Sequence, residues 1–132
     1  MSRKQIIDNG WNYPHAWGFS QIVRAGNLIF LSGQMPVDPD GNLLFEGDIR
    51  AQTRQTFDNM KTVLAAAGSS LDDVVEMVSY HTDLADLVAM NEVKAEYLTR
   101  NLPAWTAVGV TGLALPGQML EIRVVALAGD DA

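Results

Sequence analysis

The segment PAWTAVGVTGLALPGQMLEIRVVALA, residues 103–128, decides how the rest of the chain must fold. It contains two apolar stretches, residues 105–111 and 119–128, which we expect to form the two strands of a hairpin. The Pro116-Gly117 pair between them is typical of a turn. The second stretch is apolar almost without interruption, as in a strand that is covered on both faces.

Two charged residues, Glu121 and Arg123, interrupt this second stretch. A buried charge is costly unless it is paired or used. Glu121 is therefore either the partner of Arg123 or of a base from another chain, or an acid that orients or activates a water molecule. The periodicity of the strand leaves both interpretations open.

The composition predicts one acidic globular domain that spans residues 1–132. This length is sufficient for a single hydrophobic core. The formal net charge is −7 and the nine Lys and Arg residues are scattered. Because nucleic-acid binding needs a clustered basic surface, we expect no nucleic-acid partner.

The chain contains no cysteine, which excludes disulfides, thiolate metal ligands and cysteine nucleophiles. Such a composition is compatible with a reducing compartment. The first residues lack the basic-then-apolar pattern of a signal peptide, and no apolar run reaches the roughly 18 residues of a membrane helix. We therefore expect a cytoplasmic protein with no membrane partner.

The remaining elements follow from the spacing of apolar residues and from turn and capping residues. The Ala25-Gly26-Asn27 turn joins two strands, and Asp48 is a suitable N-cap for the first helix. The predicted elements are strands at 4–8, 19–24 and 28–31, a helix at 49–67, a strand at 73–82, a helix at 84–98, and the two C-terminal strands.

This order predicts an α+β fold in which two helices cover one face of a single mixed sheet. The strand at 119–128 is apolar on both faces, so the second face of the sheet also needs to be covered. No segment of the chain is left to cover it. We therefore expect an obligate oligomer that associates through this face.

Standard catalytic and nucleotide-binding motifs are absent from the sequence. The two histidines, His15 and His81, lie in different predicted segments and cannot form a metal site by themselves. We interpret His81, near the end of a strand, as exposed or locally hydrogen-bonded. His15 is interpreted as a residue of surface or interface packing.

Aromatic residues and one Ser-Gly corner offer a possible ligand site. The aromatic set either packs an interface or forms an apolar-walled cleft. Ser32-Gly33, which ends a strand, is either a β-bulge or a point where a ligand approaches backbone groups. The aromatic set consists of Trp11, Tyr13, Trp17, Phe19 and Trp105.

Residues 17–128 together resemble the YjgF/RidA family of reactive-intermediate deaminases. The resemblance is carried by a series of short matches in the same order along the chain. These are AGNLIFLSGQMPV at 25–37, residues 52–59, Ala66-Ala67-Gly68, Asp73-Val74-Val75, Asn91, Pro103-Ala104, and Pro116-Gly117 followed by Glu121-Ile122.

The resemblance implies a chorismate-mutase-like α+β fold and a homotrimer with a central β-barrel, which would cover the second sheet face. It also implies three small-molecule sites in clefts between subunits. Active members of the family hydrolyse 2-enamines and 2-imines to 2-keto acids and ammonia. They use no metal and no cofactor.

The resemblance also implies roles for individual residues. Ser32 and Gly33 match the strand-end corner that lines the cleft, and Asn91 matches a polar residue there. Glu121 matches the acid that positions the hydrolytic water, although a shifted gap near Leu115 would place Arg123 there instead. The backbone at Ala107 would help to orient the substrate.

The chain departs from the family pattern at two main positions. Trp105 stands where the deaminases carry an arginine that grips the substrate carboxylate, and Phe19 stands where a tyrosine is common. Arginine donates two hydrogen bonds to a carboxylate, whereas indole has one donor and no charge. Ala107 replaces a cysteine or similar small residue. Arg24 or Arg123 could supply a cation from elsewhere.

Two hypotheses follow. The chain is a divergent deaminase that acts on an enamine, an imine or a related C–N or C=N compound. Its apolar walls would suit a bulkier, cyclic or aromatic ligand rather than the standard small 2-aminoacrylate-type substrates. Alternatively, it is a non-catalytic trimer that binds a metabolite or acts as a regulatory or chaperone-like partner.

Overall fold

The computed structural model describes residues 3–129. One six-stranded sheet runs through the molecule in the strand order β1-β2-β3-β6-β4-β5. The elements are β1 (Lys4–Ile7), α1 (Asn12–Trp17), β2 (Ile22–Ala25), β3 (Leu28–Leu31), α2 (Ile49–Ala66), the short 3-10 helix η1 (Leu71–Asp73), β4 (Val74–His81), the 3-10 helix η2 (Leu84–Asp86), α3 (Leu87–Tyr97), β5 (Ala104–Gly109) and β6 (Leu120–Leu127).

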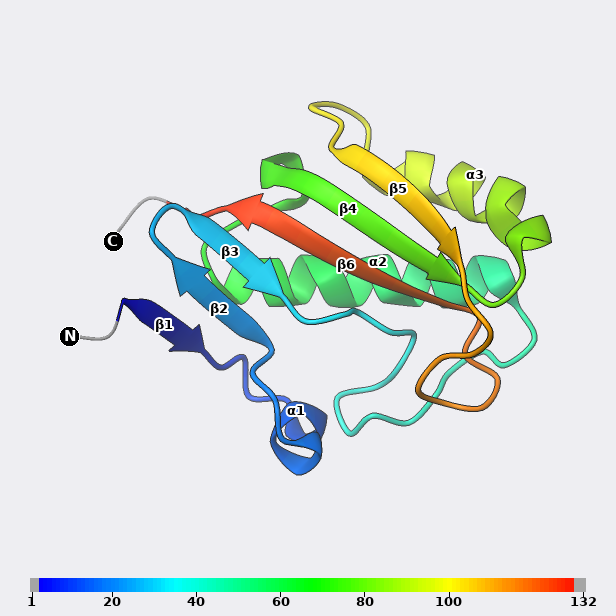
Figure 1. Cartoon of the computed structure of the whole chain (residues 1–132), viewed down its shortest axis with the longest axis horizontal. Coiled ribbons are helices and arrows are strands. Elements are labelled where there is room, and N and C mark those ends of the chain that lie inside the picture. The colour runs from blue at the N-terminus through cyan, green and yellow to red at the C-terminus, as the bar shows by residue number, and fades with distance from the viewer. Residues whose placement is uncertain (1–2, 130–132) are drawn as a thin grey trace.

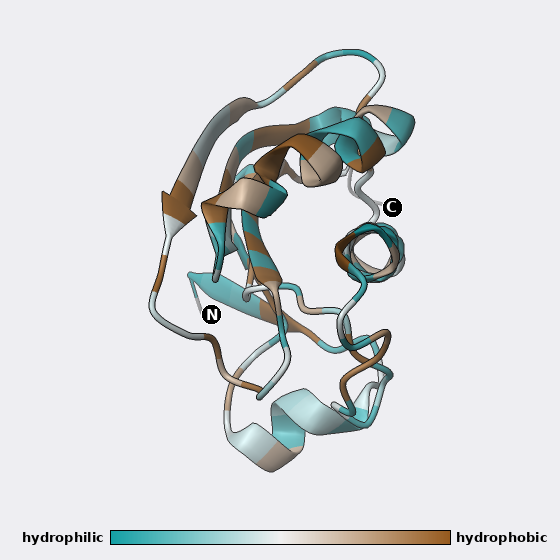
Figure 2. Ribbon diagram, turned by 90° about the vertical axis from the view of Figure 1, so that its right-hand side faces the viewer, coloured by the Kyte–Doolittle hydropathy of each residue, from teal (hydrophilic) through white to brown (hydrophobic). Residues whose placement is uncertain are grey.

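The two long helices, α2 and α3, lie on the same side of the sheet (Figures 1 and 2). The sheet is mixed, because β4 and β5 are parallel and all other neighbouring strands are antiparallel. The predicted α+β class, with one mixed sheet and helices on one face, is therefore confirmed.

Helix α2 forms as its sequence predicts. The Asp48 side chain accepts a hydrogen bond from the backbone N–H of Ala51, which caps the first turn. Phe57, Met60 and Leu64 follow at helical spacing and are fully buried against the sheet. This stripe fixes which side of the helix faces the core.

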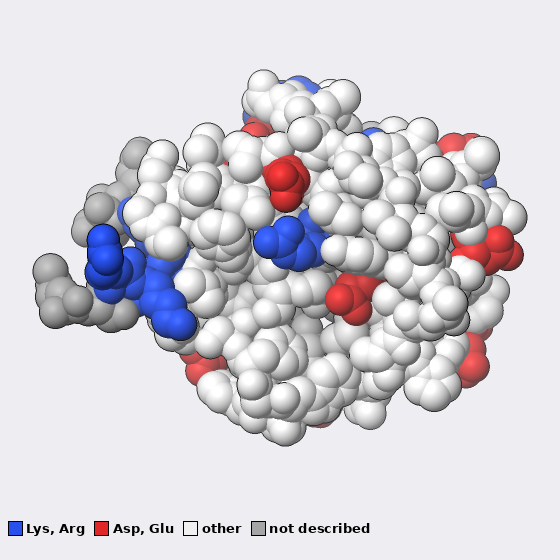
Figure 3. Space-filling view, in the orientation of Figure 1, with Lys and Arg blue, Asp and Glu red and all other residues white. Residues whose placement is uncertain are grey.

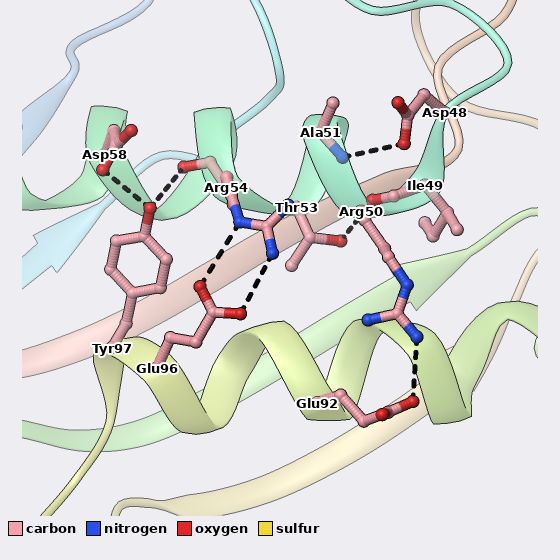
Figure 4. Close-up of polar contacts among 10 residues, drawn as sticks. All are labelled: Asp48, Ile49, Arg50, Ala51, Thr53, Arg54, Asp58, Glu92, Glu96 and Tyr97. Carbon is pink, nitrogen blue, oxygen red and sulfur yellow. Dashed lines mark hydrogen bonds and ion pairs between the residues drawn. The ribbon is translucent and has the colours of Figure 1, made fainter.

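A polar layer aligns α2 with α3 on the outside of the molecule (Figure 4). Arg54 donates two hydrogen bonds to the Glu96 carboxylate, at 3.0 and 3.3 Å, and Arg50 pairs with Glu92 at 2.9 Å. Tyr97 donates to Asp58 at 2.9 Å, and burial together with this bond raises the pKa of Tyr97 to about 12. Exposed pairs of this kind contribute little stability individually. Their geometry nevertheless keeps the two helices in register.

The expected hairpin between the two C-terminal strands is wrong. Strand β4 lies between β5 and β6, pairing in parallel with β5 and antiparallel with β6. Helix α3 connects the end of β4 to the start of β5, which runs parallel to β4. Strand β5 therefore lies at the outer edge of the sheet. Strand β6 then enters the centre between β3 and β4, where its apolar sequence is covered.

A short helix, α1, lies between β1 and β2, where the sequence predicts no element. Tyr13 and Pro14 are its buried residues, and Gly18 ends it with φ of 79°. The backbone N–H groups of Asn12 and Tyr13 donate to the Pro39 carbonyl oxygen at 3.0 and 3.2 Å. The loop at 38–41 therefore holds α1 against the end of the sheet.

The face of the sheet opposite α2 and α3, here called the open face, is only partly covered. Phe30 and Val78 are half-buried there, and Leu127 is exposed. Figure 3 shows this side as largely uncharged. Arg123 and Glu76 lie near each other on it at 3.7 Å. Within residues 3–129, no helix has the length and apolar character to cross a membrane.

Candidate functional site

The Ser32-Gly33 corner lies directly against Glu121. Gln34 and Ile122 exchange two backbone hydrogen bonds, of 2.7 and 3.0 Å, beyond the end of β3. This pairing carries the chain past Gly33 beside β6. A Cβ atom at Gly33 would overlap the Glu121 carboxylate, so any other residue here would push that side chain out of its present position.

A cavity of about 250 Å³ opens at this corner. Its wall combines one carboxylate with mostly apolar or aromatic side chains. A carboxylate beside such a cavity can accept a hydrogen bond or a proton from a bound water molecule. The lining residues are Trp17, Phe19, Ser32, Gly33, Met35, Ala114 and Glu121.

Gln118 orients the Glu121 carboxylate, a role that the sequence reasoning missed. Its side-chain amide donates to a Glu121 carboxylate oxygen at 3.2 Å and to the Leu120 carbonyl oxygen at 3.0 Å. Gln118 is 3% exposed, so this amide is fixed within the protein. Its only sequence signal is its place just after Pro116-Gly117.

Helix α2 holds the two loops that flank the cavity. Gln52 accepts a hydrogen bond from the Met119 N–H at 2.9 Å and donates to the Gly117 carbonyl oxygen at 3.0 Å. Asn59 donates to the carbonyl oxygens of Met35 and Val37 at 2.9 and 2.8 Å. The two amides are seven residues apart and therefore project from the same side of the helix.

The Ser32 hydroxyl is engaged in the fold. It donates to the Ser20 carbonyl oxygen at 2.7 Å, and the Ser32 N–H donates to Gln21 at 3.0 Å. These bonds fix the corner against the segment that precedes β2. The hydroxyl oxygen can still accept a hydrogen bond from a ligand, but its hydrogen is already donated to Ser20.

The aromatic set divides into two places. Tyr13 packs between Trp17 and Phe19, with ring centroids 5.2 and 5.9 Å away, and Trp11 lies 6.4 Å away. Burial raises the pKa of Tyr13, and the charge of Glu121 adds to the shift. Trp105 packs instead against the main core. Within one chain Trp105 therefore lies apart from the other four aromatic residues, and a shared wall between subunits stays a prediction.

Trp105 lies on the edge strand β5 with its side chain toward α3. Its indole N–H donates to the Ser79 hydroxyl oxygen at 2.8 Å. The Lys94 ammonium lies over the indole ring, 4.6 Å from the centroid. Ala107 pairs with Ser79 in the register of β4 and β5, and Asn91 is exposed one turn before Lys94 on α3.

His81 is fully buried, contrary to the exposed alternative expected for it. The locally bonded alternative is confirmed, because Nε2 lies 2.8 Å from the Ser79 hydroxyl oxygen. Burial lowers the pKa of His81, and Asp86 acts weakly in the opposite direction. Nδ1 has no hydrogen-bond partner among the described residues. His15, by contrast, is exposed and pairs with Asp8 at 2.8 Å.

The predicted site residues therefore form two groups in one chain. Four of them surround the cavity, and three lie around β5 and α3. Arg123, the alternative to Glu121, is directed toward Glu76 and does not line the cavity. Within residues 3–129, no three His, Cys, Asp or Glu side chains gather as a metal site would require. The first group is Phe19, Ser32, Gly33 and Glu121, and the second is Asn91, Trp105 and Ala107.

A family model described as Endoribonuclease L-PSP matches residues 12–128, which include both groups. The chain belongs to this family, also called YjgF/RidA. A RutC family protein of Pyrococcus horikoshii is 44% identical over 116 residues, covering 87% of this chain and 91% of that protein. The YjgH protein of Escherichia coli is 41% identical and covers 82% and 81%.

Solved structures of YjgF/RidA proteins share the whole fold. The crystal structure of RidA from an Antarctic Psychrobacter species has a TM-score of 0.84 at 37% identity and covers 93% of this chain and 98% of that one. Yeast Mmf1 has a TM-score of 0.87 at 32% identity, with coverage of 95% and 98%. The mixed sheet and both flanking helices are therefore those of a YjgF/RidA protein.

Proposed function

We propose that the chain hydrolyses a small enamine, imine or related C–N or C=N compound. The observation that carries this proposal is the Glu121 carboxylate at the wall of an apolar cavity, held between Gly33 and Gln118, in a YjgF/RidA protein. Substrates beyond the standard 2-aminoacrylate type suit this cavity, because Phe19 and Trp17 make its wall aromatic.

The reaction consumes one water molecule for each C=N bond that is hydrolysed. Water adds to the carbon of the C=N bond, and the resulting carbinolamine expels ammonia to leave a C=O bond. An enamine first moves a proton from its nitrogen to its β-carbon and becomes the imine. Glu121 accepts a proton from the attacking water and passes it to the imine nitrogen, and it then moves the hydroxyl proton of the carbinolamine to the departing nitrogen. The carboxylate is well placed for this role, because Gln118 fixes one oxygen and Gly33 leaves the other accessible at the corner.

The complete site is proposed to lie between subunits of a homotrimer. In one chain, Asn91, Trp105 and Ala107 do not line the cavity that contains Glu121. A second copy that packs its β5 edge near this cavity would join the two groups. The half-buried apolar residues of the open face provide the surface for such packing.

Ammonia release tests the proposal. The substrates are 2-aminoacrylate generated in the assay and imines formed from larger amino acids by an amino-acid oxidase. We expect hydrolysis to be faster with the protein than without it, and Glu121→Gln to lower the rate at least about 100-fold. Glu46→Gln, at an exposed carboxyl outside the cavity, is the matched control. If the two variants have equal activity, the role of Glu121 is wrong.

A non-catalytic, metabolite-binding trimer remains the second candidate. It is favoured by Trp105, whose indole is bonded to Ser79 at the position where the resemblance implies an arginine. Trp105→Arg separates the two candidates. An inert wild type combined with ammonia release by Trp105→Arg would support the binding function.

A further inference from the structure

We propose that Lys94, seated on the Trp105 ring, binds a carboxylate group of the ligand. The inference deepens the proposed function and rests on it for the location of the site. It concerns a residue that the sequence analysis did not single out. Lys94 lies on α3 and Trp105 on β5, and the structure brings them together over the outer edge of the sheet.

The position of the ammonium is defined by the ring beneath it. Lys94 Nζ lies 4.6 Å from the Trp105 centroid, within the range of a cation–π contact. The indole N–H donates to Ser79 at 2.8 Å, so the ring is fixed at its opposite edge. Ser79 is fully buried, and its hydroxyl oxygen also lies 2.8 Å from His81 Nε2. A lysine held in this way presents its charge at one place.

The charge of Lys94 is not compensated within its own helix. The ion pairs that α3 forms among residues 3–129 join Glu92 to Arg50 and Glu96 to Arg54. Lys94 is two residues from each glutamate and therefore projects from the other side of the helix. Burial lowers the pKa of Lys94, and no acid within residues 3–129 offsets the effect. An anionic group of a ligand beside the ammonium would raise this pKa again.

The surroundings of Lys94 match a planar carboxylate. Asn91, one helical turn earlier, adds a neutral amide on the same side of α3. Ala107 lies two residues after Trp105 on β5, and its outer edge has no strand partner in the sheet. The face of the indole can stack against an unsaturated or aromatic group attached to the carboxylate. These features favour an unsaturated or aromatic carboxylic acid over a neutral ligand.

Direct binding to the intact protein tests the inference with two probes of nearly the same shape, one anionic and one neutral. The probes are 2-oxobutanoate and its neutral amide, 2-oxobutanamide, titrated by calorimetry. We expect wild type to prefer the acid, and Lys94→Met to weaken binding of the acid about 10- to 100-fold while leaving the amide nearly unchanged. Lys94→Gln is measured in parallel so that the result does not depend on one side chain. Lys94→Arg should retain the preference.

Lys61→Met is the matched control, because Lys61 is an exposed lysine on α2. The inference is overturned if wild type binds acid and amide equally, or if Lys94→Met weakens both probes to the same extent. Ammonia release separates it from the proposed function. Lys94-dependent acid binding without any ammonia release supports the carboxylate site and rejects the enzyme. If Lys94→Met leaves ammonia release from carboxylate-bearing imines unchanged, the enzyme is supported and the carboxylate site is rejected.

Discussion

Several residues shape the site without any reactive group of their own. Gly33 makes room for the Glu121 carboxylate, and Gln118 holds one of its oxygens at 3.2 Å. Ser79 acts in the same manner on Trp105 and at the same time meets His81 at 2.8 Å. A polar side chain in such a position is costly to remove, because its buried partners lose their hydrogen bonds.

We expect the fold to lose stability in mild acid because of His81. Burial holds its pKa below the ordinary value of 6.5, so near pH 6 the unfolded chain binds a proton that the folded chain does not. The free energy of unfolding therefore falls as pH drops below about 6.5, until the lowered pKa is reached. Urea denaturation at pH 7.5 and 5.5 measures the difference, and His81→Leu should reduce it.

His15→Gln provides the control for this effect. His15 is exposed, and its replacement should leave the acid sensitivity in place. An unchanged difference between the two pH values in His81→Leu would show that another group is responsible. The lowered pKa values of Asp8 and Asp38 affect stability only at more acidic pH.

The sequence singles out Glu121 as a candidate, but it does not single out Lys94. A single acid in an otherwise apolar strand is visible in the pattern of that strand alone. The contact between Lys94 and Trp105 depends on β5 lying parallel to β4 and beneath α3. Periodicity gives the face of each element but not its neighbour, so the partner of Trp105 stays hidden until the fold is known.

At the level of elements, α2 positions the site as well as the core. Its apolar stripe packs on the sheet, and its amide pair, Gln52 and Asn59, holds the loops on either side of the cavity. The loops have little secondary structure of their own. Four of their backbone groups, three carbonyl oxygens and one N–H, are hydrogen-bonded by this helix instead of by other strands.

We expect Asn59→Leu to destabilise the fold by about 2–4 kcal/mol. Asn59 is 6% exposed, and its amide is the donor to two loop carbonyl groups, those of Met35 and Val37. Without it, the Val37 oxygen loses its hydrogen bond, and the Met35 oxygen keeps only the one from the Val37 N–H. Urea denaturation measures the loss. Gln55→Ala, which removes only a half-buried partner of Asn59, should cost under about 1 kcal/mol; equal losses would contradict the assignment.

The elements themselves were mostly predictable, and their arrangement was not. Helix α2 is predictable from the Asp48 cap and from the spacing of its apolar residues, which are local signals. The hairpin expected from β5 and β6 does not form. Helix α3 connects β4 to a parallel β5, and β6 then pairs with the other side of β4. The short helix α1 was missed since its six residues are too few to show a period.

For the whole molecule, the open face and the divided site point to the same conclusion. One face of the sheet is packed by helices, and the other leaves Phe30 and Val78 half-buried. The predicted site residues are also split between the cavity and the β5 edge. Association of identical chains would cover the open face and bring the two groups of site residues together.

We expect light scattering to give about three times the chain mass of 14.4 kDa. Phe30→Glu should shift the mass toward that of a single chain, because a carboxylate would then lie within the covered face. Ala65→Glu adds the same charge on the exposed side of α2 and should leave the assembly unchanged. A folded wild-type monomer at micromolar concentration would rule out the homotrimer.

The central position of β6 also has a consequence for biosynthesis. Residues 120–127 leave the ribosome after the other five strands, yet they bridge the unit formed by β1, β2 and β3 to the unit formed by β4, α3 and β5. Until they emerge, the nascent chain carries two unpaired strand edges, on β3 and β4. Such edges attract other chains, so premature termination before Leu120 should yield aggregates and not a smaller folded protein.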